Sequence, residues 1–104
     1  MKVIENITVK VNDAPIEREY IYRLLESTYS NNHKKIEVFG IEIERHDYLN
    51  GELIQVERDN CIKISPIKNK VKDIYDLAVK HIVSPIHLVE IFGQTIDECV
   101  NDFA

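Results

Sequence analysis

Glycine is scarce in this sequence of 104 residues, which contains only Gly40, Gly51 and Gly93. None of the three lies in a GxGxxG, GxSxG or P-loop pattern, the patterns in which glycine lets the backbone approach a phosphate or expose a nucleophile. Each has a structural explanation instead: a strand irregularity, a turn, or the end of a helix. We therefore expect no nucleotide binding through a glycine-rich loop.

Cysteine is also rare, and Cys61 and Cys99 stand far apart without a CxxC or another metal-ligand spacing. A zinc site needs three or four convergent ligands. His81 and His87 do not supply them, because Pro85 separates them and they cannot share one helical face. The sequence predicts no metal, no other cofactor and two free thiols that behave as small apolar groups.

Long apolar runs and an excess of positive charge are missing as well. A membrane span needs about 20 apolar residues, and Lys2, Glu5 and Lys10 interrupt the N-terminal segment, which therefore does not read as a signal peptide. The net charge of −5 and the pI near 5.3 repel phosphate backbones and anionic lipids. We therefore expect a cytoplasmic protein that binds neither membranes nor nucleic acid.

Two local features are compatible with nucleic-acid binding, but their surroundings favour other interpretations. A lysine cluster is followed at once by Asp73 and Asp76, which is typical of a solvated helix face. The C-terminal segment could form a helix-turn-helix, but its recognition helix would point Asp97, Glu98 and Asp102 at the phosphates. The lysines of the cluster are Lys63, Lys68, Lys70 and Lys72.

The remaining composition, with 44% apolar and 30% charged residues, is that of an ordinary globular protein. A chain of this length makes one domain, residues 1–104, with a modest core. Residues 1–64 follow mainly period two, whereas residues 65–104 follow a helical period. The sequence predicts an α+β fold: an antiparallel sheet of about four or five strands over residues 3–64, then two or three C-terminal helices packed on one face.

The first strands follow from alternation and residue type. Residues 7–11 alternate apolar and polar side chains and lead into turn chemistry at residues 12–15. Residues 16–27 are ambiguous between strand and helix. The β-prone Tyr20 and Tyr22 favour a strand.

Two further strands are predicted, at residues 36–46 and, shorter, at residues 61–64. The apolar parity of the first slips at Gly40, which predicts a β-bulge there. We interpret residues 28–35 as a polar connection without periodicity and residues 58–60 as a turn or bend before the last strand.

The turn after the third strand contains Asn50-Gly51, a strong signal for a two-residue hairpin turn. In that register Glu44 would face Glu57, and like charges directly opposite each other are unfavourable. A four-residue loop over residues 47–50 aligns apolar residues across the two strands instead. We prefer the longer loop.

The last third of the chain carries helical stripes and repeated helix-start signals. The tripeptide Ser-Pro-Ile occurs twice, each time before an apolar run, so we predict helix N-caps at Ser65 and Ser84. Thr95 and Glu98 form a capping box, which predicts a third N-cap at Thr95. Two short helices and one kinked helix over residues 85–103 both fit the apolar pattern.

The best polar constellation alternates along one strand face, which we call the ligand face. A histidine flanked by carboxylates can be tuned into a general base. Exposed sheet faces commonly carry such residues, however, and a solvated face is the favoured interpretation. We assign no catalytic, cofactor-binding or metal-binding residue. The ligand face comprises Glu42, Glu44, His46 and Tyr48, and we expect Gln55 and Glu57 to extend it from the neighbouring strand.

Four segments together resemble a known family. They are YRLLE (Tyr22 to Glu26), FGIEIER (Phe39 to Arg45), ERDNCIKISP (Glu57 to Pro66) and VSPIHL (Val83 to Leu88). The chain resembles small uncharacterised proteins of clostridia-type Gram-positive bacteria that share a domain of unknown function. The resemblance implies a bacterial cytoplasmic protein without an assigned activity, and it supplies no catalytic residues.

These observations favour a small non-enzymatic protein-interaction or regulatory domain, with a protein partner or self-association. The C-terminal helical segment is nearly encircled by apolar side chains, namely Leu88, Val89, Ile91 and Phe92. Any apolar surface that the sheet does not cover must be covered by a partner. The alternative is a small-molecule-binding protein or minor enzyme that uses the ligand face.

Overall fold

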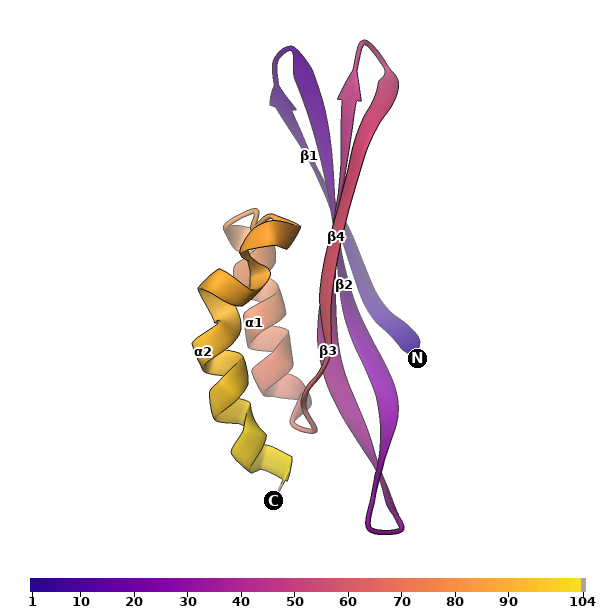
Figure 1. Ribbon diagram of the computed structural model, residues 1–104, viewed down its shortest axis with the longest axis vertical. Coiled ribbons are helices and arrows are strands. Elements are labelled where there is room, and N and C mark those ends of the chain that lie inside the picture. Colours follow the sequence, from indigo (N-terminus) through magenta and orange to yellow (C-terminus); the bar gives the residue numbers. More distant parts are fainter. Residues whose placement is uncertain (104) are drawn as a thin grey trace.

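The computed structural model describes residues 1–103, apart from the side chain of Asn31. Four antiparallel strands form one sheet in the order β1-β2-β3-β4, so each strand pairs with its neighbours in the sequence. The helices follow and lie on one face of this sheet (Figure 1), which confirms the predicted α+β fold. The elements are β1 (Lys2–Asp13), β2 (Ile16–Asn31), β3 (Lys34–Leu49), β4 (Glu52–Ser65), α1 (Lys68–Lys80), the 3-10 helix η1 (Pro85–His87), α2 (Leu88–Glu98) and the 3-10 helix η2 (Cys99–Phe103).

Strands β2 and β3 are longer than predicted, with 16 residues each. Their hairpin turns at Asn32 and His33, whose φ angles are 48° and 68°. Asn and His adopt this left-handed region more readily than most residues, and a two-residue turn of this kind matches the twist of paired strands. The polar connection expected over residues 28–35 was therefore wrong, whereas the strand interpretation of residues 16–27 is confirmed.

The hairpin between β3 and β4 corrects the predicted four-residue loop. Leu49 pairs with Glu52, so Asn50-Gly51 forms the two-residue turn, with φ angles of 52° and 78°. A register shift follows immediately: Asp47 pairs with Gln55 but Tyr48 with Leu53. The extra residue, Ile54, moves the rest of β4 by one position, so Glu44 faces Arg58 and the like-charge conflict disappears.

Strand β4 is continuous, so the bend predicted at residues 58–60 is wrong: these residues pair with residues 42–44 of β3. The irregularity predicted at Gly40 is confirmed, because the register shifts between Phe39 and Ile41. The extra residues lie in β4, which crosses closely over Gly40. A Cβ atom there would lie 2.2 Å from the carbonyl oxygen of Cys61.

The core lies between the helices and one face of the sheet. Tyr22, Leu24 and Ile43 from the strands meet Tyr75 and Leu88 from the helices, and all five are almost fully buried. Their polar atoms are satisfied: the Tyr22 hydroxyl donates to the Val83 carbonyl at 3.0 Å, and the Tyr75 hydroxyl donates to the Tyr22 carbonyl at 2.8 Å. These two bonds tie the loop after α1, and α1 itself, to the central strand β2.

The helix starts differ from the predicted capping pattern. Helix α1 begins at Lys68 with Ile67 in the N-cap position, not Ser65. The Ser65 hydroxyl instead accepts from the Ile67 amide at 3.0 Å and donates to Asp102 Oδ2 at 2.8 Å. The bond from the Ile67 amide is of the kind predicted for a cap, since it joins the hydroxyl to the amide two residues ahead, but α1 begins two residues later than predicted and the hydroxyl proton goes to Asp102.

The other two predicted caps lack the expected bond. Ser84 occupies the N-cap position of η1 with Pro85 after it, but its hydroxyl makes no cap bond and lies 3.4 Å from Arg45 Nη1. Thr95 lies inside α2, so the predicted third helix start is wrong. Segments η1, α2 and η2 follow one another without a gap, which favours a single helical run over residues 85–103. Apolar packing along the run overrides the local capping signal.

Ser65→Ala should therefore cost more stability than Ser84→Ala. The first removes two hydrogen bonds at a fully buried site, one of them to a carboxylate, and should lower the free energy of unfolding by about 2 kcal/mol. The second loses one long contact and should stay within about 0.5 kcal/mol of the parent. Urea denaturation of both variants measures the difference. A larger loss for Ser84→Ala would restore it as the functional cap.

Candidate functional site

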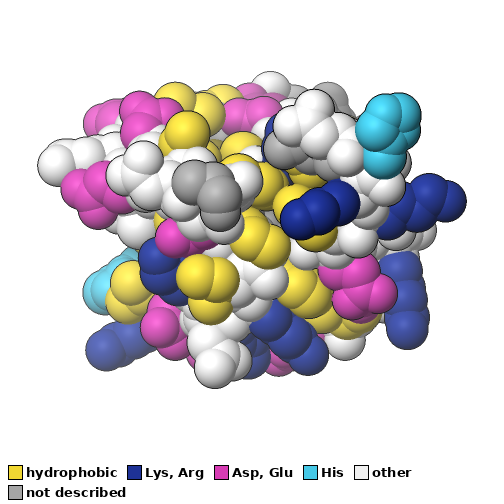
Figure 2. Space-filling view, turned by 90° about the horizontal axis from the view of Figure 1, so that it is seen from below, with side chains coloured by type: hydrophobic (Ala, Val, Ile, Leu, Met, Phe, Trp, Pro, Cys, Tyr) yellow, Lys and Arg dark blue, Asp and Glu magenta, His cyan; other side chains and the backbone are white. Residues whose placement is uncertain are grey.

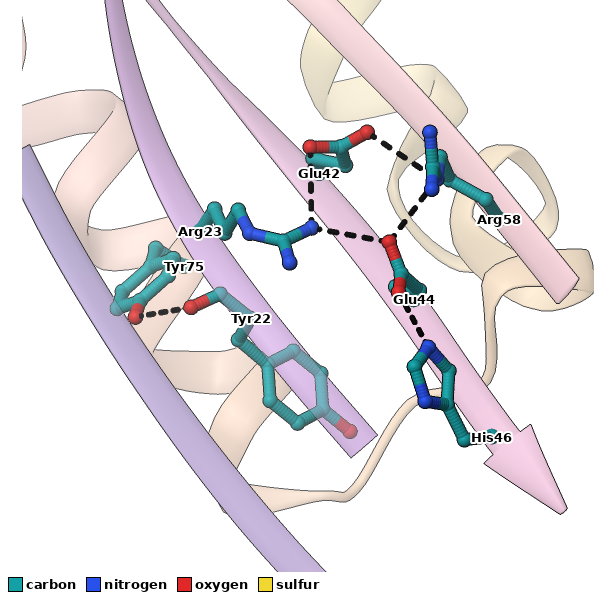
Figure 3. A network of polar contacts seen from close by, with 7 residues as sticks. All are labelled: Tyr22, Arg23, Glu42, Glu44, His46, Arg58 and Tyr75. Atoms are coloured by element: carbon teal, nitrogen blue, oxygen red, sulfur yellow. Dashed lines mark hydrogen bonds and ion pairs between the residues drawn. The ribbon is translucent and has the colours of Figure 1, made fainter. Parts of the chain in front are cut away.

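The face of the sheet opposite the helices carries a network of ion pairs (Figure 3). The strand register places Arg23 of β2 and Arg58 of β4 on either side of two β3 carboxylates. Arg23 Nη1 lies 3.1 Å from Glu44 Oε1 and 3.3 Å from Glu42 Oε2. Arg58 Nε lies 3.0 Å from the same Glu44 oxygen. Two carboxylates are thus held between two guanidinium groups.

The network continues along β3 to His46 and Tyr48. His46 Nε2 hydrogen-bonds the second Glu44 oxygen, and His46 Nδ1 lies 3.4 Å from the Tyr48 hydroxyl. The structure therefore brings all four residues of the ligand face into one chain of contacts. Sequence reasoning missed Arg23 and Arg58, because only the strand register shows that they stand beside the carboxylates.

Gln55 and Glu57 do not extend the ligand face, contrary to expectation. Gln55 pairs with Asp47 and Glu57 pairs with Arg45, so both side chains belong to the opposite face of the sheet. The physical reason is the extra residue Ile54, since a shift by one position turns the following side chains to the other face.

Glu44 is the centre of the network and its side chain is only 8% exposed. Burial raises the pKa of this carboxyl, but the hydrogen bonds from His46 and Arg23 and the charge of Arg58 outweigh it, so the pKa lies below its ordinary value. A carboxylate held this firmly in its charged form is a poor proton acceptor. The geometry therefore supports a structural ion-pair role for Glu44.

Glu44→Gln should lower the free energy of unfolding at pH 7 by about 2 kcal/mol, because the amide leaves Arg23 and Arg58 without their shared anion. The Glu44 pKa is lower in the folded protein than in the unfolded chain. Its contribution is therefore complete above the unfolded value of about 4.3 and is lost as the pH falls through the folded value.

Urea denaturation at pH 7 and at about pH 3 tests this sign. The gap between the parent and Glu44→Gln should be wide at pH 7 and narrow in acid. Glu52→Gln, at the exposed first residue of β4, is the matched control and should change stability little at either pH. A gap that stays constant between the two pH values would contradict the assigned role of Glu44.

A second ionic cluster lies on the helix-covered face, beyond the end of the helices. Asp47, whose side chain is 4% exposed, has Arg18 Nη1 and Arg45 Nε each at 3.1 Å. Arg45 also reaches Glu57 Oε2 at 3.0 Å. No sequence signal indicated this cluster, since its members come from three strands. On this face of the sheet, charged side chains thus take the place of apolar ones beyond the helices.

An open cleft of about 480 Å³ lies at the distal end of the sheet. There the β1–β2 and β3–β4 hairpins extend past the helices as two separate arms (Figure 1). Lys10, Glu19 and Tyr48 line the cleft, so it carries both signs of charge and one hydroxyl of the ligand face. The ligand face therefore meets a concave surface at Tyr48.

A family model described as "Family of unknown function (DUF6514)" matches residues 1–98. The chain belongs to this family. No curated protein and no solved structure matches it. The resemblance to proteins with a domain of unknown function is therefore confirmed at the level of the family, DUF6514.

Cys61 and Cys99 are free, and burial raises the pKa of both thiols. Across residues 1–103, no group of three His, Cys, Asp or Glu side chains is arranged to hold a metal ion. No helix of that same region is long and apolar enough to cross a membrane.

The helical run over residues 85–103 divides its apolar side chains between core and surface. Leu88 and Phe92 are buried against the sheet, at 0% and 6% exposure. Ile86, Val89 and Val100 point outward, with 63%, 65% and 66% of their area exposed. Hydrophobic side chains likewise reach the surface among charged ones when the DUF6514 chain is viewed from the end that carries its C-terminus (Figure 2). Part of the apolar surface expected on this segment is thus left uncovered.

Proposed function

We propose that this DUF6514 protein is a small, cytoplasmic, non-enzymatic interaction domain of bacteria that binds another protein through its C-terminal helical run. The observation that carries the proposal is the outward row Ile86, Val89 and Val100. Single exposed apolar residues are ordinary, but a row along one helix marks an interaction surface. The two free thiols support a reducing compartment.

The way the run is anchored supports this role. Leu88, Phe92 and Cys99 alternate with the exposed row and are almost fully buried, so the run is fixed to the sheet by one side. The exposed row is therefore presented by a packed helix rather than by a loose segment. A partner that binds it needs to order little of this chain, which favours affinity.

The polar networks of the sheet support a non-enzymatic role. Glu44 already accepts hydrogen bonds from His46 and Arg23 and forms an ion pair with Arg58, and Asp47 lies between two arginines. Using groups neutralised in this way for proton transfer would require breaking several ion pairs first.

Site-specific photo-crosslinking tests the proposal. A photoreactive amino acid in place of Val89, in cells of the organism that encodes the chain, should give a discrete adduct of higher mass. The same amino acid in place of Thr8, on the solvent face of β1, is the control and should give none. A second substitution, Val100→Asp, should remove the adduct. Equal adducts from both positions, or none from either, would refute the proposed surface.

A second candidate function, small-molecule binding or minor catalysis, is favoured by one observation. The Tyr48 hydroxyl ends the chain of contacts from Glu44 through His46 and also lines the distal cleft. A ligand in this cleft at 100 times its dissociation constant should stabilise the protein by about 2.7 kcal/mol. A thermal-shift screen measures this, and His46→Ala should abolish the shift. A shift that survives the substitution would place the ligand elsewhere.

A further inference from the structure

We infer that the partner presents a basic amphipathic helix to the helical run over residues 85–103. This inference rests on the proposed function and adds the chemistry of the partner. The apolar side of that helix would lie along a seam of five residues, and its lysine or arginine side chains would face Glu90 and Asp97. The seam comprises Ile86, Val89, Gly93, Ile96 and Val100.

The spacing of the seam predicts a helical partner. Its successive members are three, four, three and four residues apart, the repeat with which one helix packs along another. The seam crosses from η1 through α2 into η2, so it runs along the whole helical run. Val89 and Val100 are its most exposed members, and Ile96 at half-burial joins it to the core.

The charge beside the seam predicts the sign of the partner. Between His81 and Ala104 the sequence has four acidic residues and no lysine or arginine. Glu90 and Asp97 each directly follow a seam residue and are exposed, so they form its outer flank. The inner flank, Phe92 and Cys99, is buried against the sheet. A partner helix on the seam would therefore lie beside the carboxylates of the outer flank, and lysine or arginine at that position would complement their charge.

The same flank disfavours a second copy of this chain as the occupant. Two copies packed seam to seam would bring Glu90 and Asp97 of one beside those of the other. Like charges in such positions oppose association. Of the four lysines of α1, Lys70 and Lys72 are already engaged by Asp102, Glu5 and Asp76 within one chain.

Gly93 at the centre of the seam leaves room for a large partner side chain. A Cβ atom there would meet only Val89 Cγ1, at 3.5 Å, so the fold does not require glycine. Glycine inside a helix lowers its stability. Gly93→Ala should therefore raise the thermal midpoint of the free protein and still weaken partner binding, because the added methyl group fills the seam.

Titration with a synthetic peptide tests the inference. The probe is an acetylated, amidated peptide of three heptads, with leucine at the seam positions and lysine beside them. Its controls are a scrambled peptide of the same composition and a version with glutamate for lysine. Fluorescence anisotropy should show saturable binding of the probe alone. Glu90→Lys with Asp97→Lys should weaken it at least about tenfold, and Val89→Asp should abolish it.

A matched charge control distinguishes binding at the seam from attraction due to the net charge of the protein. Glu17→Lys with Glu52→Lys makes the same change in net charge on the distal arms and should leave the affinity within about twofold. Equal binding of the scrambled peptide, or an equal loss in this control, would overturn the inference. A dimer by light scattering that Val89→Asp makes monomeric would also overturn it, in favour of a second copy. A Val89 crosslink in cells without peptide binding would refute only the basic helix, not the interaction surface.

Discussion

Gly40→Ala should destabilise the protein by about 3 kcal/mol. The added methyl carbon would lie 2.2 Å from the carbonyl oxygen of Cys61 and 2.5 Å from backbone atoms of Ile62. Backbone atoms of a paired strand cannot turn away as a flexible side chain can, so β3 and β4 must separate locally. That separation breaks the register between Phe39–Ser65 and Ile41–Cys61 that leads the chain into α1.

Chemical denaturation of Gly40→Ala and Gly93→Ala side by side measures this effect. The second variant adds the same methyl group at an ordinary contact distance, 3.5 Å from Val89 Cγ1, and should stabilise the protein by about 1 kcal/mol. The two substitutions are chemically identical, so a shared effect of glycine on the unfolded chain cancels between them. Equal stability of the two variants would contradict the close crossing of β4 over Gly40.

Leu88→Ala should lower the free energy of unfolding by about 3 kcal/mol, because Leu88 is fully buried and its removal leaves a cavity. Its neighbour Val89 is 65% exposed, and Val89→Ala should stay within about 0.5 kcal/mol of the parent. The pair tests which side of the helical run faces the sheet. A larger loss for Val89→Ala would reverse the orientation and with it the proposed interaction surface.

The fold class was predictable because it depends on periodicity, which is a local property. Alternation around Tyr20 and Tyr22 identified β2 although its composition also suits a helix, and the helical period of residues 65–104 indicated the C-terminal helices. Gly40 marked an irregularity, since a parity slip beside a glycine is visible without a partner strand. In each case neighbouring residues carry the whole signal.

The errors arose where a distant contact decides the outcome. The turn at Asn50-Gly51 was rejected because the register without a bulge opposes Glu44 to Glu57, and nothing local announces the extra residue Ile54. The Ser65 hydroxyl does accept from the Ile67 amide, but helix α1 begins two residues later than predicted, and the hydroxyl also donates to Asp102 near the other end of the chain. In both cases the local signal is real, but contacts between residues far apart in the sequence decide the strand register and the helix start.

The ligand face likewise combines a local signal, visible in the sequence, with long-range contacts that are not. Glu44, His46 and Tyr48 share one side of β3 by simple alternation, and the structure brings them into contact. The arginines that neutralise the carboxylates come from β2 and β4 and depend on the register. Sequence reasoning could therefore find the polar row but not the ion pairs that make its central carboxylate a poor base.

The order of the strands has a consequence for how the chain is made. Each strand pairs only with its sequence neighbours, so the whole sheet can assemble on the ribosome as residues 2–65 emerge. At that moment Leu24, Ile41 and Ile43 still face water, because the helices that bury them are synthesised last. A nascent chain thus exposes the apolar face of its sheet until the 38 further residues, Pro66 to Phe103, have appeared. Chaperone demand should peak in that interval rather than after release.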